Sequence, residues 1–225
     1  MPLALATAGL GPALNAGPAP AALLRQDGAA AGARRRFEAE EEIYAEGDRV
    51  VHFYKVVSGA VRTYRLLSDG RRQIDGFHLP GDIFGLEAGA ERRTGADALV
   101  DTTLVAHRRS DRDALTGEAG ALAHEVAAAM LRALERAQDH MLLLGRKSAK
   151  ERVASFLLGL AGRFGTEGPI ALPMSRADIA DHLGLTIESV SRTFTQLERE
   201  GVIALANHRR AVEVQDRAAL RRLDA

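Results

Sequence analysis

The stretch from residue 175 to residue 199 decides the fold, and it reads SRADIADHLGLTIESVSRTFTQLER. It divides at Gly184 into two short helical patterns. Two such patterns joined by a glycine-centred turn predict a helix-turn-helix. In that motif the second helix lies in the major groove of DNA, where its exposed side chains meet the edges of the bases.

Local signals mark where each of the two helices begins and ends. Ser175 followed by Asp178 is typical of a capping box at the first helix. Gly184 stands where that helix must end, because glycine adopts left-handed backbone angles at little cost. Thr186 is expected to cap the second helix, with Glu188 in its positively polarised first turn. The small core between the helices is expected to consist of Ile179, Leu183, Leu185 and Val190.

Three side chains of the second helix are the candidate base readers. Glu188, Ser191 and Arg192 are three and four residues apart, so they share one face. A carboxylate accepts from cytosine, a guanidinium donates to guanine O6 and N7, and a hydroxyl suits a thymine edge. The alternative is a Glu188–Arg192 surface ion pair on an ordinary helix. The candidate contacts to DNA phosphates, each equally consistent with solvated surface, are Ser175, Arg176, Thr186, Ser189, His208 and Arg209.

Residues 37–110 have the texture of β-strands. Runs rich in β-branched and aromatic residues, such as 50–57 and 60–64, alternate with turn signals. Asp69-Gly70 between two such runs is a strong hairpin signal. The turns follow one another about every 10 residues, which predicts an antiparallel sandwich or barrel.

Residues 118–146 have the texture of one long helix. Apolar residues recur there at alternating steps of three and four, which suits the seam of a two-stranded coiled coil. We expect a homodimer, and the alternative is that the stripe packs on the chain's own core. The expected seam residues are Ala127, Met130, Leu134, Ala137, Met141 and Leu144.

The residues after the long helix are predicted to form a winged head. A second helix is expected over 149–162, followed by a loop rich in glycine and proline. Beyond the helix-turn-helix, two strand-like runs at 202–205 and 211–214 flank the basic segment 207–210. This pattern predicts a β-hairpin wing with a basic tip.

Composition limits the remaining possibilities. The 30 basic and 30 acidic residues balance, but residues 34–120 carry a net charge of −2 and residues 142–225 carry +3. The small basic excess lies with the predicted DNA reader. Cysteine is absent, which excludes disulfides and cysteine-bound clusters, and we expect no metal site. No apolar run reaches the roughly 18 residues that a membrane helix needs, so a cytoplasmic location fits.

The expected domain organisation has four parts. The first 33 residues contain 12 alanines, five glycines and four prolines, and we expect a disordered leader rather than a signal peptide. The expected sheet domain spans 34–117, the dimerisation helix 118–146 and the winged helix-turn-helix 147–225. The fold class is therefore α+β.

From about residue 37 to residue 214 the chain resembles the Crp/Fnr family of bacterial transcription regulators, and within it the FixK-like branch. The resemblance rests on the glycine turns, on QDHMLLLGRK at 138–147 and most specifically on 172–192. It implies an antiparallel β-roll like the cyclic-nucleotide-binding jelly roll, then a long dimerisation helix and a winged helix-turn-helix. The Glu188-x-x-Ser191-Arg192 pattern is similar to the Fnr-type reader, which implies an inverted pair of TTGAT-like half-sites.

Two departures from the family concern ligands. Without cysteine, the oxygen-labile cluster of Fnr cannot be held. The segment 84–94 also lacks the family's Gly-Glu…Arg-Ser phosphate cassette, although Arg92 and Arg93 are present. We therefore expect no cofactor and a β-roll kept as a scaffold. The alternative is a ligand- or haem-gated regulator, whose candidate axial ligands are His52, His78, His107, His124 and His140.

The resemblance implies a homodimeric activator that binds double-stranded DNA and RNA polymerase. It implies control of genes for microaerobic respiration, nitrogen fixation or denitrification. An enzyme is the alternative from a different class, but the chain has no His-Glu-x-x-His, no phosphate loop and no Gly-x-Ser-x-Gly elbow. No catalytic residue is therefore expected. A module that uses the two helices for protein contacts stays open.

Overall fold

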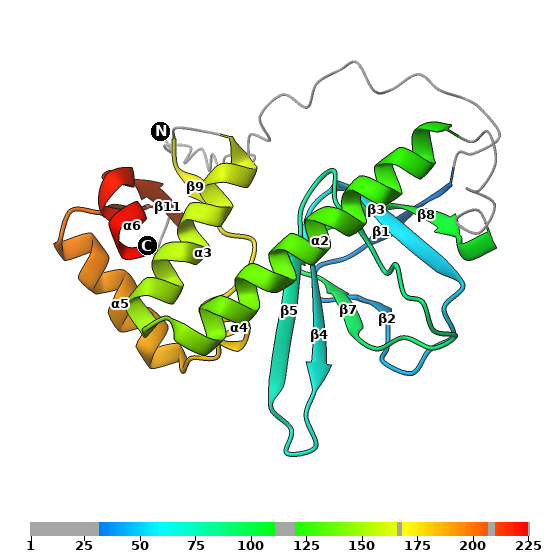
Figure 1. The fold of residues 1–225 in the computed structure, drawn as a ribbon, viewed down its shortest axis with the longest axis horizontal. Coiled ribbons are helices and arrows are strands. Elements are labelled where there is room, and N and C mark those ends of the chain that lie inside the picture. Colours follow the sequence, from blue (N-terminus) through cyan, green and yellow to red (C-terminus); the bar gives the residue numbers. More distant parts are fainter. Residues whose placement is uncertain (1–31, 111–119, 166–167, 207–209, 225) are drawn as a thin grey trace, which may run out of the picture. The chain divides into compact units, whose positions relative to one another are not determined.

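Short runs of β-branched and aromatic residues fold into two antiparallel sheets in the first half of the chain. The computed structural model describes residues 32–110, 120–165, 168–206 and 210–224 (Figure 1). The first sheet contains, in spatial order, β1 (Ala33–Phe37), β8 (Thr102–Arg108), β3 (His52–Ser58) and β6 (Ile83–Phe84). The second contains β2 (Glu42–Tyr44), β7 (Gly95–Ala98), β4 (Val61–Leu66) and β5 (Arg72–His78).

The two sheets form a β-roll because both contribute to one apolar core. The alternation of side chains along each strand turns one face of each sheet inward. The buried residues of this core are Tyr44, Tyr54, Val56, Val61, Phe84, Ala96, Leu104 and Ala106. The predicted antiparallel sandwich or barrel is therefore confirmed as a β-roll.

The β4–β5 hairpin projects from the second sheet. Its turn lies at Asp69-Gly70, where Gly70 has a φ of 84°, a left-handed angle that favours glycine. The strands pair from Val61 opposite His78 to Leu66 opposite Arg72. The hairpin predicted from Asp-Gly is confirmed. Its strand β5 contacts a helix from the second half of the chain.

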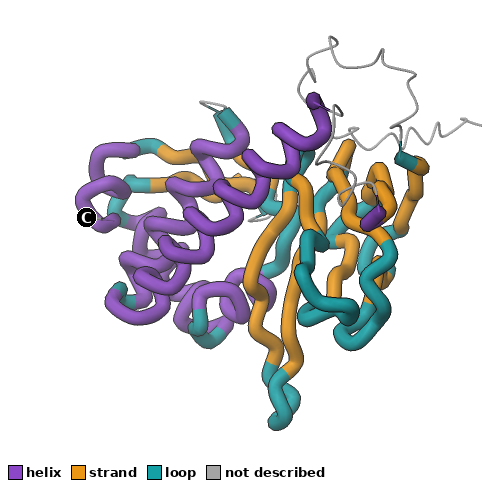
Figure 2. Tube along the Cα trace, turned by 45° about the vertical axis from the view of Figure 1, so that its right-hand side comes forward, coloured by secondary structure: helices purple, strands orange, loops and turns teal. Residues whose placement is uncertain are grey.

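One long helix, α2 (Gly120–Arg146), follows the β-roll (Figures 1 and 2). Val126 and Ala129 pack with Phe53 and Ile83 of the first sheet. Lys55 of β3 also pairs with Glu125 of α2 at 2.6 Å. These contacts fix the first half of α2 to the β-roll. Among the described residues, no helix is both long and apolar enough to cross a membrane.

The remaining elements form the head. Its helices are α3 (Ala149–Phe164), α4 (Arg176–Leu183), α5 (Ile187–Arg199) and α6 (Arg217–Asp224). Its sheet contains β10 (Ile203–Ala206), β11 (Ala211–Val214) and β9 (Ile170–Ala171), in that order. The predicted wing is confirmed as β10 and β11, while its tip at 207–209 lies outside the described residues. Two short elements, β9 and α6, were absent from the sequence prediction.

Candidate DNA-reading face

The first helix of the reading head begins as its sequence predicts. The Ser175 hydroxyl accepts a hydrogen bond from the backbone N–H of Asp178 at 3.1 Å. Oδ2 of Asp178 in turn accepts from the backbone N–H of Ser175 at 2.9 Å, which completes a capping box. Burial would raise the pKa of Asp178, but hydrogen bonds from Ser175 and the nearby arginines Arg62 and Arg72 hold it below its usual value.

The turn between α4 and α5 is set by glycine and threonine. Gly184 ends α4 with a φ of 61° and a left-handed conformation. Thr186 then caps α5, since its hydroxyl accepts from the backbone N–H of Ser189 at 3.2 Å. Both predicted helix ends are confirmed.

The α5 helix has one buried and one exposed face. Val190, Phe194 and Leu197 are buried in the head. Glu188, Ser191 and Arg192 are all exposed, so the helical spacing brings them to the opposite face. No ion pair joins Glu188 to Arg192 in the part of the chain that the structure describes. The three groups are therefore open to a ligand that approaches α5 from outside.

The charge of Glu188 is favoured by its position in the first turn of α5. Its pKa is lowered first by a hydrogen bond from its own backbone N–H, then by the Thr186 hydroxyl, with a smaller effect of Arg192. An ionised carboxylate is an acceptor only, so at neutral pH it can receive the amino group of cytosine.

The candidate phosphate contacts have varied surroundings. The Ser175 and Thr186 hydroxyls cap their helices, and Ser189 accepts from the Thr186 hydroxyl at 3.1 Å. The guanidinium carbon of Arg176 lies 3.6 Å from the centroid of the Phe194 ring, and the side chain is half-buried. His208 and Arg209 lie outside the described residues.

An exposed apolar side chain stands beside the three candidate base readers. Ile187, the first residue of α5, exposes 48% of its surface. Ile187 is not among the residues that the sequence predicted to contact DNA. An isoleucine at the exposed start of a recognition helix is a signal that could have been used, because apolar side chains contact the thymine methyl group in the major groove.

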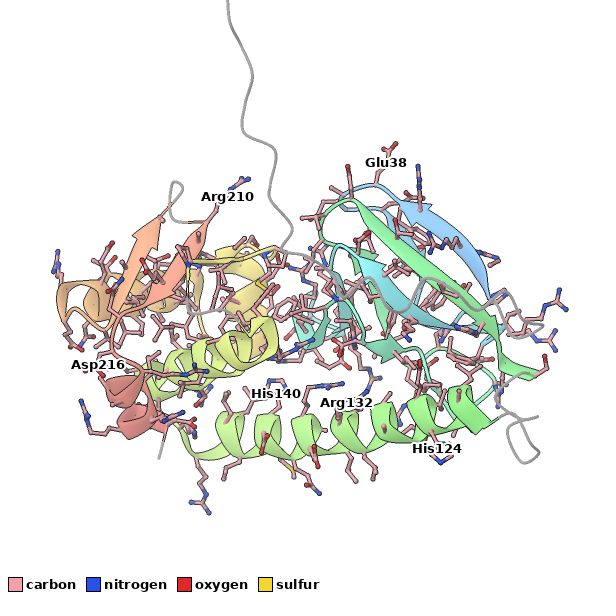
Figure 3. All side chains as sticks on the ribbon, turned by 90° about the horizontal axis from the view of Figure 1, so that it is seen from above. Glu38, His124, Arg132, His140, Arg210 and Asp216 are labelled. Carbon is pink, nitrogen blue, oxygen red and sulfur yellow. The ribbon has the colours of Figure 1, made fainter. Side chains whose placement is uncertain are left out.

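The α2 helix carries an exposed apolar strip. Met130, Leu134 and Met141 of the expected seam are exposed, Met141 to 70%. Leu131 and Leu142 lie beside them and are exposed too, although the sequence analysis did not include them. Ala127 and Ala137 are exposed, whereas Leu144 is half-buried against the core of the head. Figure 3 shows a row of α2 side chains that project away from the rest of the molecule.

The β-roll contains a cavity of about 500 Å³ against α2, lined among others by His78, Arg93 and Arg136. Arg92 lies nearby but is engaged within the protein. Its Nη1 donates to Glu87 and to the Gly85 carbonyl, each at 3.0 Å, and its Nη2 donates to the His52 carbonyl. Because its terminal amino groups already have acceptors, Arg92 does not fit the role of a phosphate ligand for a cyclic nucleotide.

The five candidate axial histidines have different surroundings. His78 is half-buried against Phe84 with its Nε2 3.0 Å from the Thr63 hydroxyl, and His107 is buried against Phe53. His52 is half-buried beside Tyr54 in β3. His124 and His140 both lie on α2 (Figure 3). His124 is exposed, while His140 stacks on His182 of α4. Among the described residues, no cluster of three or more potential metal ligands was found.

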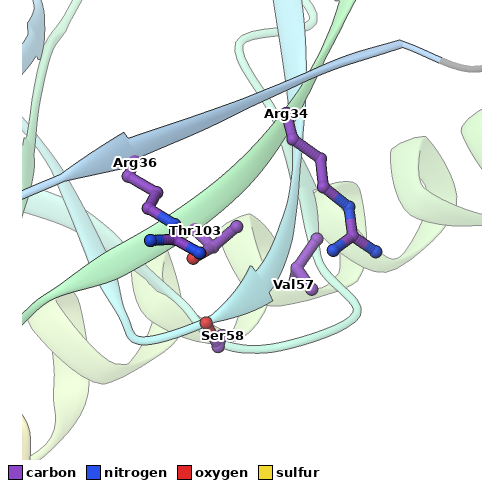
Figure 4. Close-up of a pocket in the computed structure, with 5 residues that line it drawn as sticks. All are labelled: Arg34, Arg36, Val57, Ser58 and Thr103. Carbon is purple, nitrogen blue, oxygen red and sulfur yellow. The ribbon is translucent and has the colours of Figure 1, made fainter.

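A second hollow, of about 400 Å³, lies beside β1 (Figure 4). Arg34 and Arg36 line it together with Val57, Ser58 and Thr103. Neither arginine makes an ion pair with another described residue. The edge of the first sheet is therefore basic.

The structure combines a β-roll, a long helix with an exposed apolar strip, and a winged head with an outward-facing α5. This combination defines the class of the protein as a helix-turn-helix transcription regulator. Comparison of the sequence with family models agrees. Residues 34–118 match the cyclic nucleotide-binding domain, and residues 151–223 match the Crp-like helix-turn-helix domain.

Two relatives and one solved structure are similar over most of the chain. The nitrogen fixation regulation protein FixK of Azorhizobium caulinodans is 49% identical over 202 residues, 88% of this chain and 81% of its own. FixK of Rhizobium meliloti is 48% identical over 182 residues, 81% of this chain and 82% of its own. The structure of FixK2 from Bradyrhizobium japonicum gives a TM-score of 0.81 at 46% identity, and the match covers 86% of this chain and 98% of that one. The chain therefore belongs to the Crp/Fnr family of transcription regulators, in its FixK-like branch.

Proposed function

We propose that the protein is a homodimeric, sequence-specific transcription activator that binds an inverted pair of TTGAT-like half-sites. One observation carries the proposal: an acid, a hydroxyl and a guanidinium stand together on the exposed face of α5, beside its capped first turn. These three groups match the donors and acceptors of base edges in the major groove. Ile187 supplies an apolar contact for a thymine methyl group beside them.

The apolar strip of α2 supports the homodimer. Isolated apolar side chains on a surface are ordinary, but a continuous apolar strip along one helix is typical of a surface that is buried in an interface. A second copy of α2 would supply it, with the seam around Met130, Leu134 and Met141. We propose the same division as the sequence analysis: a β-roll over 34–117, a dimerisation helix over 118–146 and a DNA-binding head over 147–225.

The names of the relatives support a proposal about the regulated genes. Two of them are nitrogen fixation regulation proteins. We propose that this chain controls genes of nitrogen fixation, microaerobic respiration or denitrification, and that it does so by contact with RNA polymerase. The basic hollow beside β1 suits an acidic surface of a protein partner.

We propose that the β-roll acts as a scaffold without a bound nucleotide or redox cluster, and the engagement of Arg92 with Glu87 supports this. The alternative, a gated regulator, predicts a ligand for the cavity at His78. Calorimetry against cyclic nucleotides tests one form of it. An optical spectrum before and after addition of haem tests the other, since a Soret band would favour haem gating.

Binding of a labelled TTGAT-N4-ATCAA duplex tests the main proposal. We expect the full chain to bind this duplex at least about a hundredfold more tightly than a scrambled duplex of the same composition. Equal binding to both duplexes would contradict sequence-specific reading. Analytical ultracentrifugation of the same complex gives the stoichiometry, and one chain per duplex would contradict the dimer.

A further inference from the structure

The first helix of the reading head is attached to the β-roll through one carboxylate. Oδ2 of Asp178 accepts from Ser175 and so belongs to the capping box of α4. Oδ1 of the same carboxylate accepts from Nη2 of Arg72 at 2.7 Å and from Nη1 of Arg62 at 3.1 Å. One oxygen of Asp178 thus binds within its own helix, and the other binds the strands β5 and β4.

Arg72 binds two acids of α4 at once. Its Nη2 reaches Asp178, and its Nε donates to Oδ2 of Asp181 at 2.9 Å. Asp178 and Asp181 are three residues apart, so they lie on one face of α4. A planar guanidinium can bond both carboxylates only when that face is turned towards β5, and a change in the rotation of α4 would break one of the bonds.

Arg62 secures the other side of this contact. It is almost fully buried, and it also donates to Asp97 of β7 at 2.8 Å and to Glu40 at 2.7 Å. The β-roll therefore holds the Arg62 side chain in place independently of Asp178. We call Arg62, Arg72, Asp178 and Asp181 the Asp178 latch.

Uncharged contacts extend the same interface. Nδ1 of His182 lies 3.0 Å from the Ile74 carbonyl, and Nε2 of Gln73 donates to the His182 carbonyl at 3.3 Å. Phe77 of β5 packs against Phe156 of α3 and against His182. The hairpin β4–β5 thus meets the head along α4, which lies beside β5 (Figures 1 and 2).

We propose that Arg72 and Arg62 are positioning residues for DNA reading, which hold each head at one angle and so preset the spacing between the two α5 helices of the dimer. The inference rests on the proposed function of α5. A dimer reads half-sites about one helical turn apart, and the two recognition helices must match that distance. Since α2 is bound to the β-roll, a head that is latched to the β-roll is also fixed relative to the dimer seam.

Ion pairs of this kind specify a geometry more than they stabilise a fold. Burying charged groups costs free energy that their attraction roughly offsets, so such a network adds little to stability. Its forked hydrogen bonds nevertheless favour one arrangement over similar ones. Loss of Arg72 leaves Asp178 bonded to Arg62 and to Ser175, so it should affect which operators are bound more than whether the chain folds.

The test uses the full chain and two operators that differ only in the spacer between half-sites. Arg72→Ala removes the bonds to Asp178 and Asp181. Its matched control is Arg71→Ala, which removes the same charge from the neighbouring residue, whose ion pair with Asp69 stays within the turn. Each protein is titrated with TTGAT-N4-ATCAA and with the same duplex carrying a spacer of five bases, which moves and rotates the second half-site.

We expect Arg72→Ala to bind the four-base operator about five- to tenfold more weakly and the five-base operator nearly as well as the parent chain. The ratio between the two operators should fall by the same factor, while Arg71→Ala leaves it unchanged. Equal losses on both operators, or no difference between the two variants, would overturn the proposal. Circular dichroism tests whether each variant folds. If Arg72→Ala does not fold, the variants Arg72→Lys and Asp181→Asn are compared with Arg71→Ala in its place.

The failure of this proposal is distinguishable from failure of the proposed function. Arg192→Ala is titrated in parallel on the four-base operator. If Arg192→Ala binds as the parent chain does, α5 is not the reader, whatever Arg72→Ala does. If Arg192→Ala loses affinity and Arg72→Ala matches its control, α5 reads DNA without the latch.

Discussion

At the residue scale, Arg192 is the side chain most suited to read a base. It is exposed on α5, one turn beyond Glu188, and no described carboxylate pairs with it. A guanidinium that is already paired would have to break its ion pair before it could bind guanine. Arg192 has no such cost, so the bidentate bonds to O6 and N7 that we propose for it would contribute fully to recognition.

Replacing Arg192 by alanine should weaken binding to the TTGAT-like operator by about 1–3 kcal/mol and relax the choice at one base pair. The reason is that the lost bonds reach a base edge rather than a phosphate. Fluorescence anisotropy on the operator and on its single-base variants measures both effects. Arg199→Ala, an exposed arginine at the far end of α5, is the matched control. An equal loss on scrambled DNA would show that Arg192 holds phosphate.

At the element scale, α2 has one face packed against the β-roll and another face exposed. Val126 and Ala129 meet the β-roll, whereas Leu131, Leu134 and Met141 are more than half exposed in a single chain. A residue buried only by a second copy can be changed without disturbing the fold of its own chain. The α2 strip therefore allows the dimer to be tested separately from the fold.

Leu134→Glu should dissociate the dimer, because two copies would bring two carboxylates together in an apolar seam. We expect sedimentation at micromolar concentration to change from dimer to monomer, with a circular dichroism spectrum like that of the parent chain. Binding to the two-half-site operator should fall at least about tenfold, since each half-site is then bound singly. Ala121→Glu, exposed on α2 and about 140° away around the helix, is the control and should stay dimeric. A dimeric Leu134→Glu would contradict the seam.

The elements that the sequence predicted are those specified by neighbouring residues. Asp69-Gly70 and the Ser175–Asp178 box act over two to four positions, so their outcome depends little on the rest of the fold. The strand β9 has only two residues and exists because it pairs with β11, a long-range contact that leaves no pattern in the chain. The same holds for the bond between Arg62 and Asp178, which joins residues 116 positions apart. The capping box identified Asp178 but not its second set of partners.

At the scale of the whole molecule, charge is distributed unevenly despite a net charge of zero. The head carries the small basic excess, so contacts with the DNA backbone release counterions. Operator affinity should fall steeply with salt, by about a thousandfold or more between 50 and 200 mM for a dimer with roughly six phosphate contacts. Titrations at four salt concentrations give the slope. Arg72→Ala should keep the slope of the parent chain, because the latch binds carboxylates of the protein itself. A flat salt dependence of the parent chain would contradict binding to the DNA backbone.

Two histidines near the meeting of β-roll and head affect stability in acid. Burial, and then the neighbouring His140, lower the pKa of His182 from 6.5 to about 4, with smaller effects of Asp75 and Arg163. Burial likewise lowers the pKa of His78 to about 4. Nδ1 of His78 has no hydrogen-bond partner among the residues that the structure describes, so the neutral ring is the form that fits its site.

Between pH 6.5 and pH 4 the unfolded chain binds protons at these histidines that the folded chain does not. The free energy of unfolding should therefore fall as the pH drops through this range, by up to about 1.4 kcal/mol per pH unit for each histidine, and only the contribution of the histidines should level off below pH 4. His182→Gln removes one of the two groups, so it should reduce the slope by about half while an amide N–H still reaches the Ile74 carbonyl. Urea unfolding at five pH values and one protein concentration measures the slope, with His124→Gln on exposed α2 as the control. An unchanged slope in His182→Gln would mean that His182 binds protons alike in the folded and the unfolded chain, which would contradict a lowered pKa in the folded chain.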